Sequence, residues 1–370
     1  MTCFRNTIFV RRNIIVYKNI VAALLLLTVL SGMALSGIVL SGCGNTSVDP
    51  SQITIPRTTN KLRLIQDGDY TEFKVTGTFT DPELDINPTD STINLVTGTT
   101  GYCEPKVNTT TTAFNGTLRI DWSAAQLTQP FSGGAMLDVM KQVTTLTLDI
   151  TPPGTVTTTE YISQDPTTGS VTLHAFDGNP GLSQYYWVSN VADLGSINNP
   201  VVLPSPLPAN GTNGGTYFVN QGCDGNSACT QSIRSYTNNL TFTGENIDGL
   251  KTALGKFNPL SYVYLGSMLD TNSPSVLATL DMRGFCDTQN AFFKGVAWVL
   301  PEVGLLELDN SCASNTIQSV DMNDPAVVNA AHACSLDPGS VTNNVVPVYL
   351  IKAWDFKAEI SATNIPLPSN

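Results

Sequence analysis

The chain has 370 residues, of which 18 are basic, 30 are acidic and only two are histidine. Its formal net charge of −12 argues against a nucleic-acid-binding protein and against a surface that binds anionic lipid headgroups. Charged residues make up only 13% of the chain, so hydroxyl and amide side chains must supply most of the polar surface.

The N-terminus predicts export. Four basic residues precede 21 residues, 20–40, that carry no charge. A basic segment, an apolar segment and an exit of small residues together predict a secretory signal peptide over residues 1–42. The alternative is an uncleaved signal anchor, because 21 apolar residues are long enough to span a bilayer of about 30 Å. Ser31, Gly32, Ser36 and Gly37 weaken a helix near the exit and favour processing.

The signal ends in Leu40-Ser41-Gly42-Cys43. This sequence resembles the lipobox of bacterial lipoproteins, whose pattern is Leu-Ser/Ala-Gly/Ala-Cys. The resemblance implies cleavage between Gly42 and Cys43, a diacylglycerol thioether on Cys43, and acylation of the new amino group with a fatty acid such as palmitate. Three acyl chains exceed the two signals that stable membrane attachment needs. Gly44 stands where aspartate favours inner-membrane retention in the family, so the resemblance implies an outer-membrane destination.

The mature chain is acidic and begins with a polar segment. Because the leader holds four of the 18 basic residues and no acids, 14 basic residues remain against 30 acidic ones, a net charge of −16. Such a balance helps to keep an exported protein soluble. Residues 43–60 contain Pro50 and Pro56 and are expected to form a lipidated tether that reaches roughly 50 Å when fully extended.

From Lys61 onward, apolar and polar residues alternate with a period of two. Successive side chains of a strand point to opposite faces, so each such segment buries one face and wets the other. Thr-rich strands separated by Gly, Pro, Asn and Asp predict an all-β fold, mainly antiparallel sandwich or open-barrel sheets. The apolar positions of the clearest segments are Phe73, Val75, Gly77 and Phe79; Leu118, Ile120 and Trp122; Leu146, Leu148 and Ile150; and Trp354, Phe356, Ala358 and Ile360.

One to three short helices are expected beside the strands, in addition to a helical signal segment. Asp324-Pro325 has the residue types of a helix N-cap and first helical position, and predicts a helix that ends near Cys334. The spacing of Ile247, Leu250 and Leu254 allows a second helix, and residues 138–143 a single helical turn.

Residues 201–216 carry the strongest boundary signal within the body. They follow Pro200, contain three further prolines and end in an Asn/Gly-rich run, so they predict a linker or an exposed loop. The expected division is an N-terminal β-rich domain at residues 61–200 and a C-terminal β-rich domain with disulfides at residues 217–370. The alternative is one extended sheet with a long loop.

Two short segments resemble uncharacterised β-rich bacterial envelope lipoproteins. Residues 64–73 match an opening strand with the pattern Leu…Gly-(Asn/Asp)-aromatic-x-x-aromatic, and residues 298–305 match a late Trp-x-x-Pro-x-x-Gly strand pair. Both segments also fit ordinary β-hairpin chemistry. The resemblance implies a fold and carries no activity.

Six cysteines remain after the leader and the anchor, an even number that predicts up to three disulfides in an oxidising compartment. A local bridge between Cys223 and Cys229 is the first expectation, because they flank a turn-forming insert. Zinc is the rival explanation, but the chain has no Cys-x-x-Cys pair and only two histidines. The six are Cys103, Cys223, Cys229, Cys286, Cys312 and Cys334.

Calcium is the one cofactor that the sequence suggests, since oxygen-bearing residues alternate along one segment as they do in loops that bind hard cations. Ile86 stands where an EF-hand loop needs glycine, and two prolines stiffen the segment, so a turn-rich loop is the favoured interpretation. The oxygen-bearing residues are Asp81, Glu83, Asp85, Asn87 and Asp90.

A further binding hypothesis is aromatic. Tyr185 and Trp187 share one face of an expected strand, and an exposed pair would stack on a sugar or dock a protein partner. The other interpretation, which is favoured, is that this face belongs to the core.

Signals for catalysis are weak. Gly-x-Ser-x-Gly and Ser-x-x-Lys motifs are absent. His174 is expected as a solvent-side or edge residue, and His332 as a helix residue beside a disulfide. Glu302, Glu307 and Asp309 are considered for glycosidase-like chemistry only because they flank one strand.

The resulting hypothesis is a non-catalytic, lipid-anchored protein of the bacterial cell envelope with a binding or architectural role. Its expected contacts are the membrane, through the anchor, and a protein or glycan partner, with no nucleic acid. The alternatives are an exported hydrolase and a carrier of an apolar ligand.

Overall fold

The structure is a computed structural model that describes residues 54–149, 154–177, 185–221, 223, 229, 231–270, 290–338 and 345–368. The signal peptide expected at residues 1–42, the expected lipidation site Cys43 and residues 44–53 lie outside these ranges. The described residues form an all-β fold, as the period-two pattern predicts. They include no helix with the length and apolar character that crossing a membrane requires.

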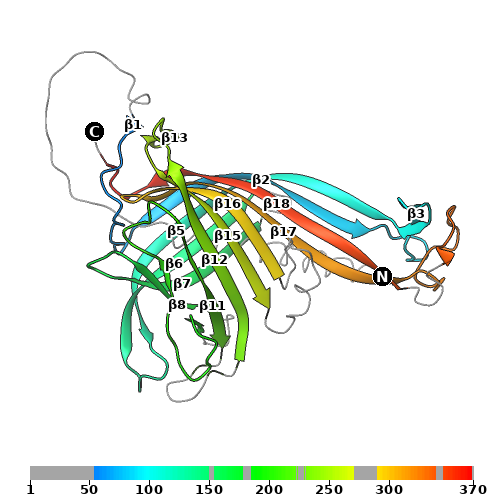
Figure 1. The fold of residues 1–370 in the computed structure, drawn as a ribbon, viewed down its shortest axis with the longest axis horizontal. Helices are drawn as coiled ribbons and strands as arrows, with labels where there is room; N and C mark the ends of the chain where they lie inside the picture. Colours follow the sequence, from blue (N-terminus) through cyan, green and yellow to red (C-terminus); the bar gives the residue numbers. More distant parts are fainter. Residues whose placement is uncertain are drawn as a thin grey trace, which may run out of the picture.

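Thirteen strands form one antiparallel sheet, in the order β10-β8-β7-β6-β5-β2-β18-β17-β16-β15-β12-β11-β9. A further pairing of β8 with β9 closes all of them except β10 into a twelve-stranded, barrel-like ring, here called the barrel (Figure 1). The strands in chain order are β2 (Tyr70–Leu84), β5 (Val107–Thr128), β6 (Met136–Leu148), β7 (Gly154–Gln164), β8 (Val171–Phe176), β9 (Tyr186–Ser189), β10 (Val201–Leu203), β11 (Thr212–Gln221), β12 (Gln231–Glu245), β15 (Leu260–Asp270), β16 (Asn290–Leu300), β17 (Gly304–Asp321) and β18 (Val345–Thr363).

Side chains of the barrel strands pack against one another in the interior of the barrel. Each of the twelve strands contributes to one buried apolar cluster, including the expected inward positions Phe73, Leu118 and Ile120, all 0% exposed. Leu62 and Leu207 reach the same cluster from two segments that lie across one end of the barrel. A backbone bond from the Leu207 N–H to the Asn60 carbonyl (2.7 Å) joins these two segments.

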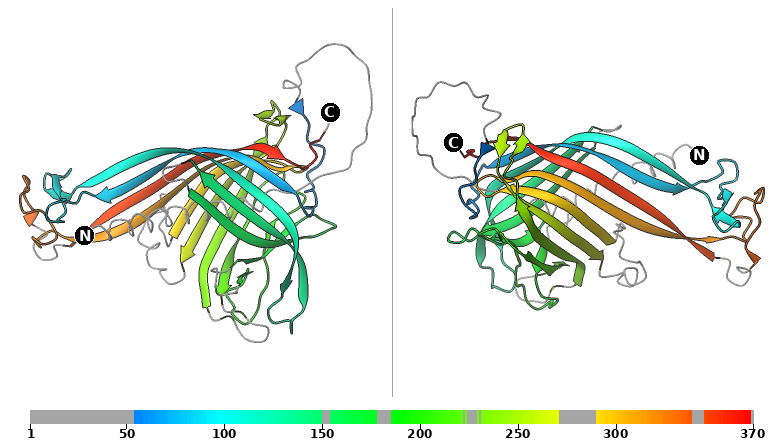
Figure 2. Two further views of the ribbon diagram at one scale, coloured as in Figure 1. Left: turned by 180° about the vertical axis from the view of Figure 1, so that it is seen from behind. Right: turned by 45° about the horizontal axis from the view of Figure 1, so that its top comes forward.

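Four strands run beyond the barrel as an arm, which Figures 1 and 2 show as its long extension. They are the ends of β5, β2, β18 and β17 that have no partner on β6 or β16. At the tip of the arm, the hairpin of β3 (Leu95–Thr97) and β4 (Cys103–Pro105) meets residues 322–337 through parallel bridges from Ile93 to Val328 and from Tyr102 to Ser335. A second apolar cluster, separate from the barrel interior, packs here.

A disulfide between Cys103 and Cys334 closes the tip across 231 residues of sequence. Replacing both cysteines with alanine is expected to lower the free energy of unfolding by about 2–4 kcal/mol, because the unfolded chain regains the entropy of a long loop. Urea denaturation measures the loss, and limited proteolysis should place the first new cleavage at the tip. Removing Cys223–Cys229, which closes only six residues, is the matched control and should cost less. A control loss that is equal or larger would contradict this account of the tip.

In the described residues, strands of both expected β-rich domains belong to one continuous sheet, as in the alternative of one extended sheet. Six strands from residues 70–189 are neighbours in the ring, and so are six strands from residues 212–363. The two arcs join at the β2–β18 and β9–β11 pairings, and both contribute to one apolar cluster. The expected linker, residues 201–216, contains β10 and the first half of β11. Its prolines do not exclude strands because β10 is a short edge strand.

The three expected helices are also absent from the described residues. Residues 138–143 belong to β6, and residues 247–254 lie in a hairpin of β13 (Leu250–Thr252) and β14 (Gly255–Phe257). Asp324 does cap a turn, since its side chain accepts a bond from the Ala326 N–H (2.8 Å). The helix does not continue because Val328 then bridges Ile93 across the tip.

The end of the expected tether is docked on the barrel. β1 (Thr54–Ile55) pairs with β14, and one carboxylate oxygen of Glu302 accepts bonds from the backbone N–H groups of Thr58 (2.6 Å) and Thr59 (3.1 Å). In Figure 1, β1 and the arm tip lie at opposite ends of the long axis.

Candidate functional site

The wall of the barrel is incomplete between β10 and β11. β9 pairs with only three residues of β11, Phe218 to Asn220, and the chain then leaves the wall at Asn190. It returns as β10, which pairs with β8 and not with β11. Residues 212–217 of β11 therefore have a strand partner on the β12 side alone among the described strands. We call this gap the seam.

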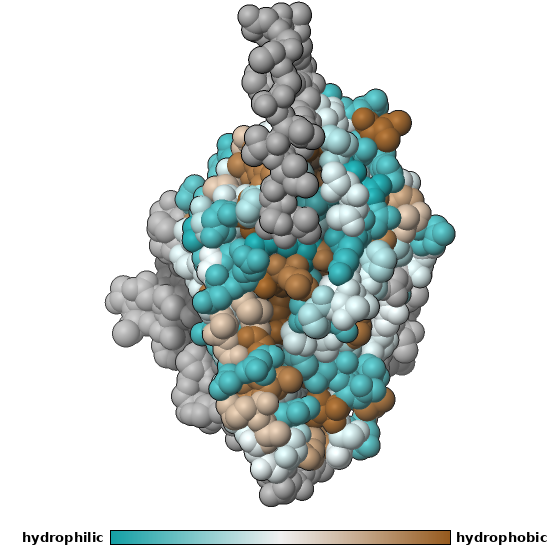
Figure 3. All heavy atoms as spheres, turned by 90° about the vertical axis from the view of Figure 1, so that its left-hand side faces the viewer, coloured by the Kyte–Doolittle hydropathy of each residue, from teal (hydrophilic) through white to brown (hydrophobic). Residues whose placement is uncertain are grey.

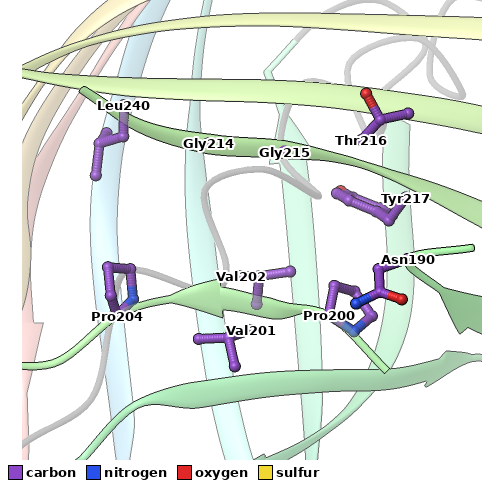
Figure 4. A pocket seen from close by; sticks show the side chains of 10 residues that line it. All are labelled: Asn190, Pro200, Val201, Val202, Pro204, Gly214, Gly215, Thr216, Tyr217 and Leu240. Carbon is purple, nitrogen blue, oxygen red and sulfur yellow. The ribbon is translucent and has the colours of Figure 1, made fainter. Parts of the chain in front are cut away.

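A pocket of about 180 Å³ occupies the seam (Figure 4). One wall is β10 with its flanking prolines, and the other is the free side of β11. Tyr217 and Leu240 form its floor, and both side chains belong to the apolar cluster of the barrel interior. The lining residues are Asn190, Pro200, Val201, Val202, Pro204, Gly214, Gly215, Thr216, Tyr217 and Leu240.

The chemistry of the seam is apolar and uncharged. None of its ten lining residues is acidic or basic. Gly214 and Gly215 leave the middle of the β11 wall without side chains, and a Cβ atom on Gly215 would meet no other atom within 4 Å. Val201 is 57% exposed at the mouth. The seam thus offers backbone groups and apolar contact rather than charge.

A second arrangement of polar groups surrounds His174, which is 6% exposed rather than at an exposed edge as expected. The register between β7 and β8 shifts beside His174, and this irregularity turns the side chain under the segment that precedes β10. His174 Nε2 lies 2.7 Å from Ser163 Oγ, and Nδ1 lies 2.9 Å from Asn199 Oδ1.

Asn199 settles which nitrogen of His174 carries the proton. The Asn199 amide nitrogen donates to the Val188 carbonyl (2.7 Å), which leaves its oxygen to accept from Nδ1. Nε2 is then unprotonated and accepts from the Ser163 hydroxyl. This tautomer is the one that a serine nucleophile needs in its general base, although it equally satisfies the polar groups of a strand irregularity.

Burial lowers the pKa of His174 below its ordinary value of 6.5, while the Asn199 bond opposes this shift. As the pH falls through about 6.5, the unfolded chain takes up a proton that the folded protein does not, so the free energy of unfolding decreases. The expected slope is at most about 1.4 kcal/mol per pH unit. Denaturation of His174→Gln between about pH 7.5 and 5 should lack this component.

His332→Gln at the arm tip is the matched control for the pH series and should keep the slope. If both variants keep the same slope as the unaltered protein, the neutral state of His174 does not govern the pH dependence.

Of the aromatic pair considered for binding, Trp187 is buried, as the favoured interpretation predicts, and Tyr185 is half-buried. Trp187 is 3% exposed and packs in a cluster on the outer face of the barrel with Tyr161 and Ala175. Tyr185 shares that face as expected, with its ring 6.3 Å from that of Trp187 and 5.1 Å from that of Tyr161. The Trp187 ring is thus not available to a ligand in this arrangement.

The segment considered for calcium lies at the end of β2 and in the loop after it. Asp85 binds Lys106 (2.7 Å), whose ammonium lowers the pKa of the Asp85 carboxyl. Asp90 accepts bonds from the hydroxyl (2.7 Å) and N–H (3.0 Å) of Thr92, which lower its pKa. Asp81 and Glu83 lie in β2, and Asn87 accepts from the Thr89 N–H (3.0 Å). These interactions engage Asp85, Asn87 and Asp90 within the protein itself.

The three carboxylates considered for glycosidase-like chemistry have separate roles. Glu302 holds the docked segment at Thr58 and Thr59. Glu307 is buried beside Lys357 (2.9 Å), and burial raises its pKa against the effect of that ammonium. Asp309 is exposed on the same strand as Glu307.

The cysteines fall into three groups. Cys223 and Cys229 form a disulfide, and the Cys229 N–H donates to the Leu194 carbonyl (2.7 Å), which ties this bridge to the segment before β10. Cys103 and Cys334 form the second disulfide, with His332 Nδ1 3.5 Å from Cys103 Sγ. Cys312 lies in β17, and Cys286 lies outside the described residues.

Sequence reasoning missed both arrangements for identifiable reasons. Ser163 and Asn199 meet His174 only through strand pairing and an irregular register, neither of which leaves a local signal. The Thr/Gly/Asn run at residues 211–216 did carry a signal, since it is uncharged and, unlike the equally uncharged residues 200–208, contains no proline. Its composition predicts a linker as readily as an unprotected strand edge.

No protein-family model matches this sequence, and no curated protein or solved structure matches it either. The geometry of the seam and of the His174 cluster therefore carries the functional argument.

Proposed function

We propose that this protein is a non-catalytic, lipid-anchored protein of the bacterial cell envelope, directed to the outer membrane, that binds a partner through the wall of its barrel. The lipobox supports the anchor. The docked residues 54–59, at the opposite end from the arm tip, support an orientation in which the anchor is near β1 and the arm extends away from it (Figure 1).

The observation that carries the binding role is the open seam in the wall of the barrel. Side chains from all twelve strands form one buried apolar cluster inside the barrel, whereas the seam leaves one edge of the wall without a strand partner among the described strands. The face at the end opposite the arm shows apolar side chains interspersed with hydrophilic ones (Figure 3). The seam instead gathers uncharged residues around one pocket.

Labelling with palmitate in cells tests the anchor. The unaltered protein is expected to incorporate label and to fractionate with the outer membrane, whereas Cys43→Ser should do neither. Label that persists in Cys43→Ser would contradict the proposed site of lipidation.

A photo-cross-linking amino acid in place of Val201 tests the binding role. Met136, on β6, is a matched control because its exposure of 56% equals that of Val201, 57%, within one per cent. A discrete cross-linked product from position 201 alone is expected. Equal products from both positions would contradict recognition at the seam.

The His174 cluster favours a second candidate function, an exported ester hydrolase. In that reaction Ser163 Oγ attacks the ester carbonyl, its proton passes to His174 Nε2 and then to the leaving alkoxide, and water releases the acyl group. A fluorophosphonate that labels the folded protein but not Ser163→Ala would establish this activity. Absence of labelling would leave the cluster as a structural support for the irregularity in β8.

A further inference from the structure

The threonine pairs of β11 and β12 show which backbone groups of β11 face the seam. Thr212 Oγ1 lies 2.9 Å from Thr241 Oγ1, and Thr216 Oγ1 lies 3.0 Å from Thr237 Oγ1. Such close side chains are typical of the pairs in an antiparallel ladder that do not bond through their backbones.

A backbone bond confirms this assignment. The Phe242 N–H donates to the Gly211 carbonyl (3.0 Å), so the backbone groups of Gly211 face β12. Along an antiparallel strand these groups point to alternate sides, so every second residue after Gly211 also faces β12. The N–H and C=O groups of Thr212, Gly214 and Thr216 therefore point away from β12 and into the seam. All three residues are exposed.

We propose that this free edge of β11 accepts an extended, uncharged peptide segment of a partner protein as an added β-strand. The inference rests on the proposed binding function and names its ligand class. Three outward residues at every second position present paired donors and acceptors about 6.8 Å apart, which is the repeat of a strand. A backbone in the extended conformation supplies the complementary groups, as in other cases of strand addition.

The side chains around the edge define the sequence of the added strand. Because the pocket lining carries no charge, a charged ligand side chain would lose its hydration there without gaining a partner. The space beside Gly215, above Tyr217 and Leu240, fits an apolar side chain at every second position of the ligand. Thr212 and Thr216 lie on the other face and suit hydroxyl side chains.

The two walls of the seam differ in how they are protected. Free strand edges are usually guarded by charges, prolines or short length. β10 is only three residues long and is flanked by Pro200 and Pro204, so its edge is protected against pairing with another strand. Residues 211–217 contain no charge and no proline, and the free part of β11 is twice as long. This unguarded edge is the one that an added strand would extend.

Fluorescence anisotropy on the full chain in detergent tests the proposal. The probe is a labelled, end-blocked heptapeptide of alternating Thr and Val. Its control is the same peptide N-methylated at every second residue, which removes the N–H groups on one edge. We expect saturable binding of the first peptide and at least tenfold weaker binding of the second. Equal affinity of both peptides would overturn strand addition.

Variants at one position separate the seam from the rest of the surface. Gly215→Leu fills the pocket and is expected to weaken binding at least tenfold, while Gly215→Ala, whose Cβ meets nothing, should bind as the unaltered protein does. Thermal unfolding checks that both fold. A folded Gly215→Leu with unchanged affinity overturns the proposal.

Two further outcomes would assign the seam to another occupant and overturn the proposal. One is a concentration-dependent dimer that Gly215→Leu abolishes, which would indicate pairing of two copies of this chain. The other is displacement of the peptide by a fluorescent fatty acid, which would indicate an apolar carrier.

The failure of this inference is distinguishable from failure of the proposed function. If the protein incorporates palmitate and cross-links at position 201 but does not bind the peptide, the proposed function stands and the proposed ligand class is wrong. If the protein binds the peptide but does not incorporate palmitate, only the proposed anchor is wrong.

Discussion

Replacing Asp69 with alanine is expected to lower the free energy of unfolding by about 3–5 kcal/mol, because it leaves a buried guanidinium without its counter-ion. The Arg63 side chain is 2% exposed and that of Asp69 is 7% exposed. Arg63 donates to both carboxylate oxygens of Asp69, with Nη2 3.0 Å from Oδ1. The Gln66 N–H donates to the same carboxylate (2.7 Å), so the alanine variant loses this bond as well.

The matched control is Asp121→Ala, which removes the carboxylate of an exposed pair. Arg119 and Asp121 lie 2.8 Å apart, but their side chains are 42% and 45% exposed. Water solvates both groups after the substitution, so a change within about 1 kcal/mol is expected. Urea denaturation of both variants gives the comparison. Similar losses from the two substitutions would contradict the claim that burial makes the Arg63 pair important.

Replacing Trp122 with alanine should lower the free energy of unfolding by a comparable amount, about 3–5 kcal/mol. The indole is 1% exposed in the barrel interior. Its Nε1–H donates to Gln142 Oε1 (2.7 Å), and the Gln142 amide donates in turn to Glu160 Oε2 (2.7 Å). Alanine therefore creates a cavity and removes the donor at the head of a buried chain of hydrogen bonds.

Trp122→Phe separates the two contributions, since it keeps most of the volume and removes the donor. A loss of about 1–3 kcal/mol is expected from the unpaired Gln142 oxygen. Trp298→Ala, at a half-buried indole of β16, is the control and should cost less than Trp122→Ala. Denaturant midpoints rank the three variants, and a Trp298 loss as large as that of Trp122 would contradict the assignment of the core.

The sequence predicted the all-β class and the inward faces of several strands because alternation is a local property. Phe73, Leu118 and Ile120 are buried as their alternation indicates. The sequence could not predict that β18 pairs with β2, because strand order depends on contacts between residues almost 300 positions apart. The joining of the two parts of the chain in one sheet therefore had no local signal.

The helix expectations failed because a local capping signal does not decide whether the next residues continue the helix. Asp324 caps a turn as predicted, but Val328 then forms a long-range β-bridge with Ile93, so the helix does not continue. For the candidate site, the uncharged run before Tyr217 was visible in the sequence, yet the absence of its strand partner was not. The missing partner results from the path of the chain at the end of β9 and the start of β10. The sequence of β11 itself does not indicate that path.

Amide hydrogen exchange on the free protein, resolved residue by residue, tests most directly whether the barrel wall is open along β11. The account predicts an alternation, with fast exchange at Thr212, Gly214 and Thr216 and slow exchange at Gly215 and Tyr217, whose N–H groups face β12. Equal protection of all these amides would mean that the seam is closed by hydrogen bonds, and would contradict the proposed binding edge.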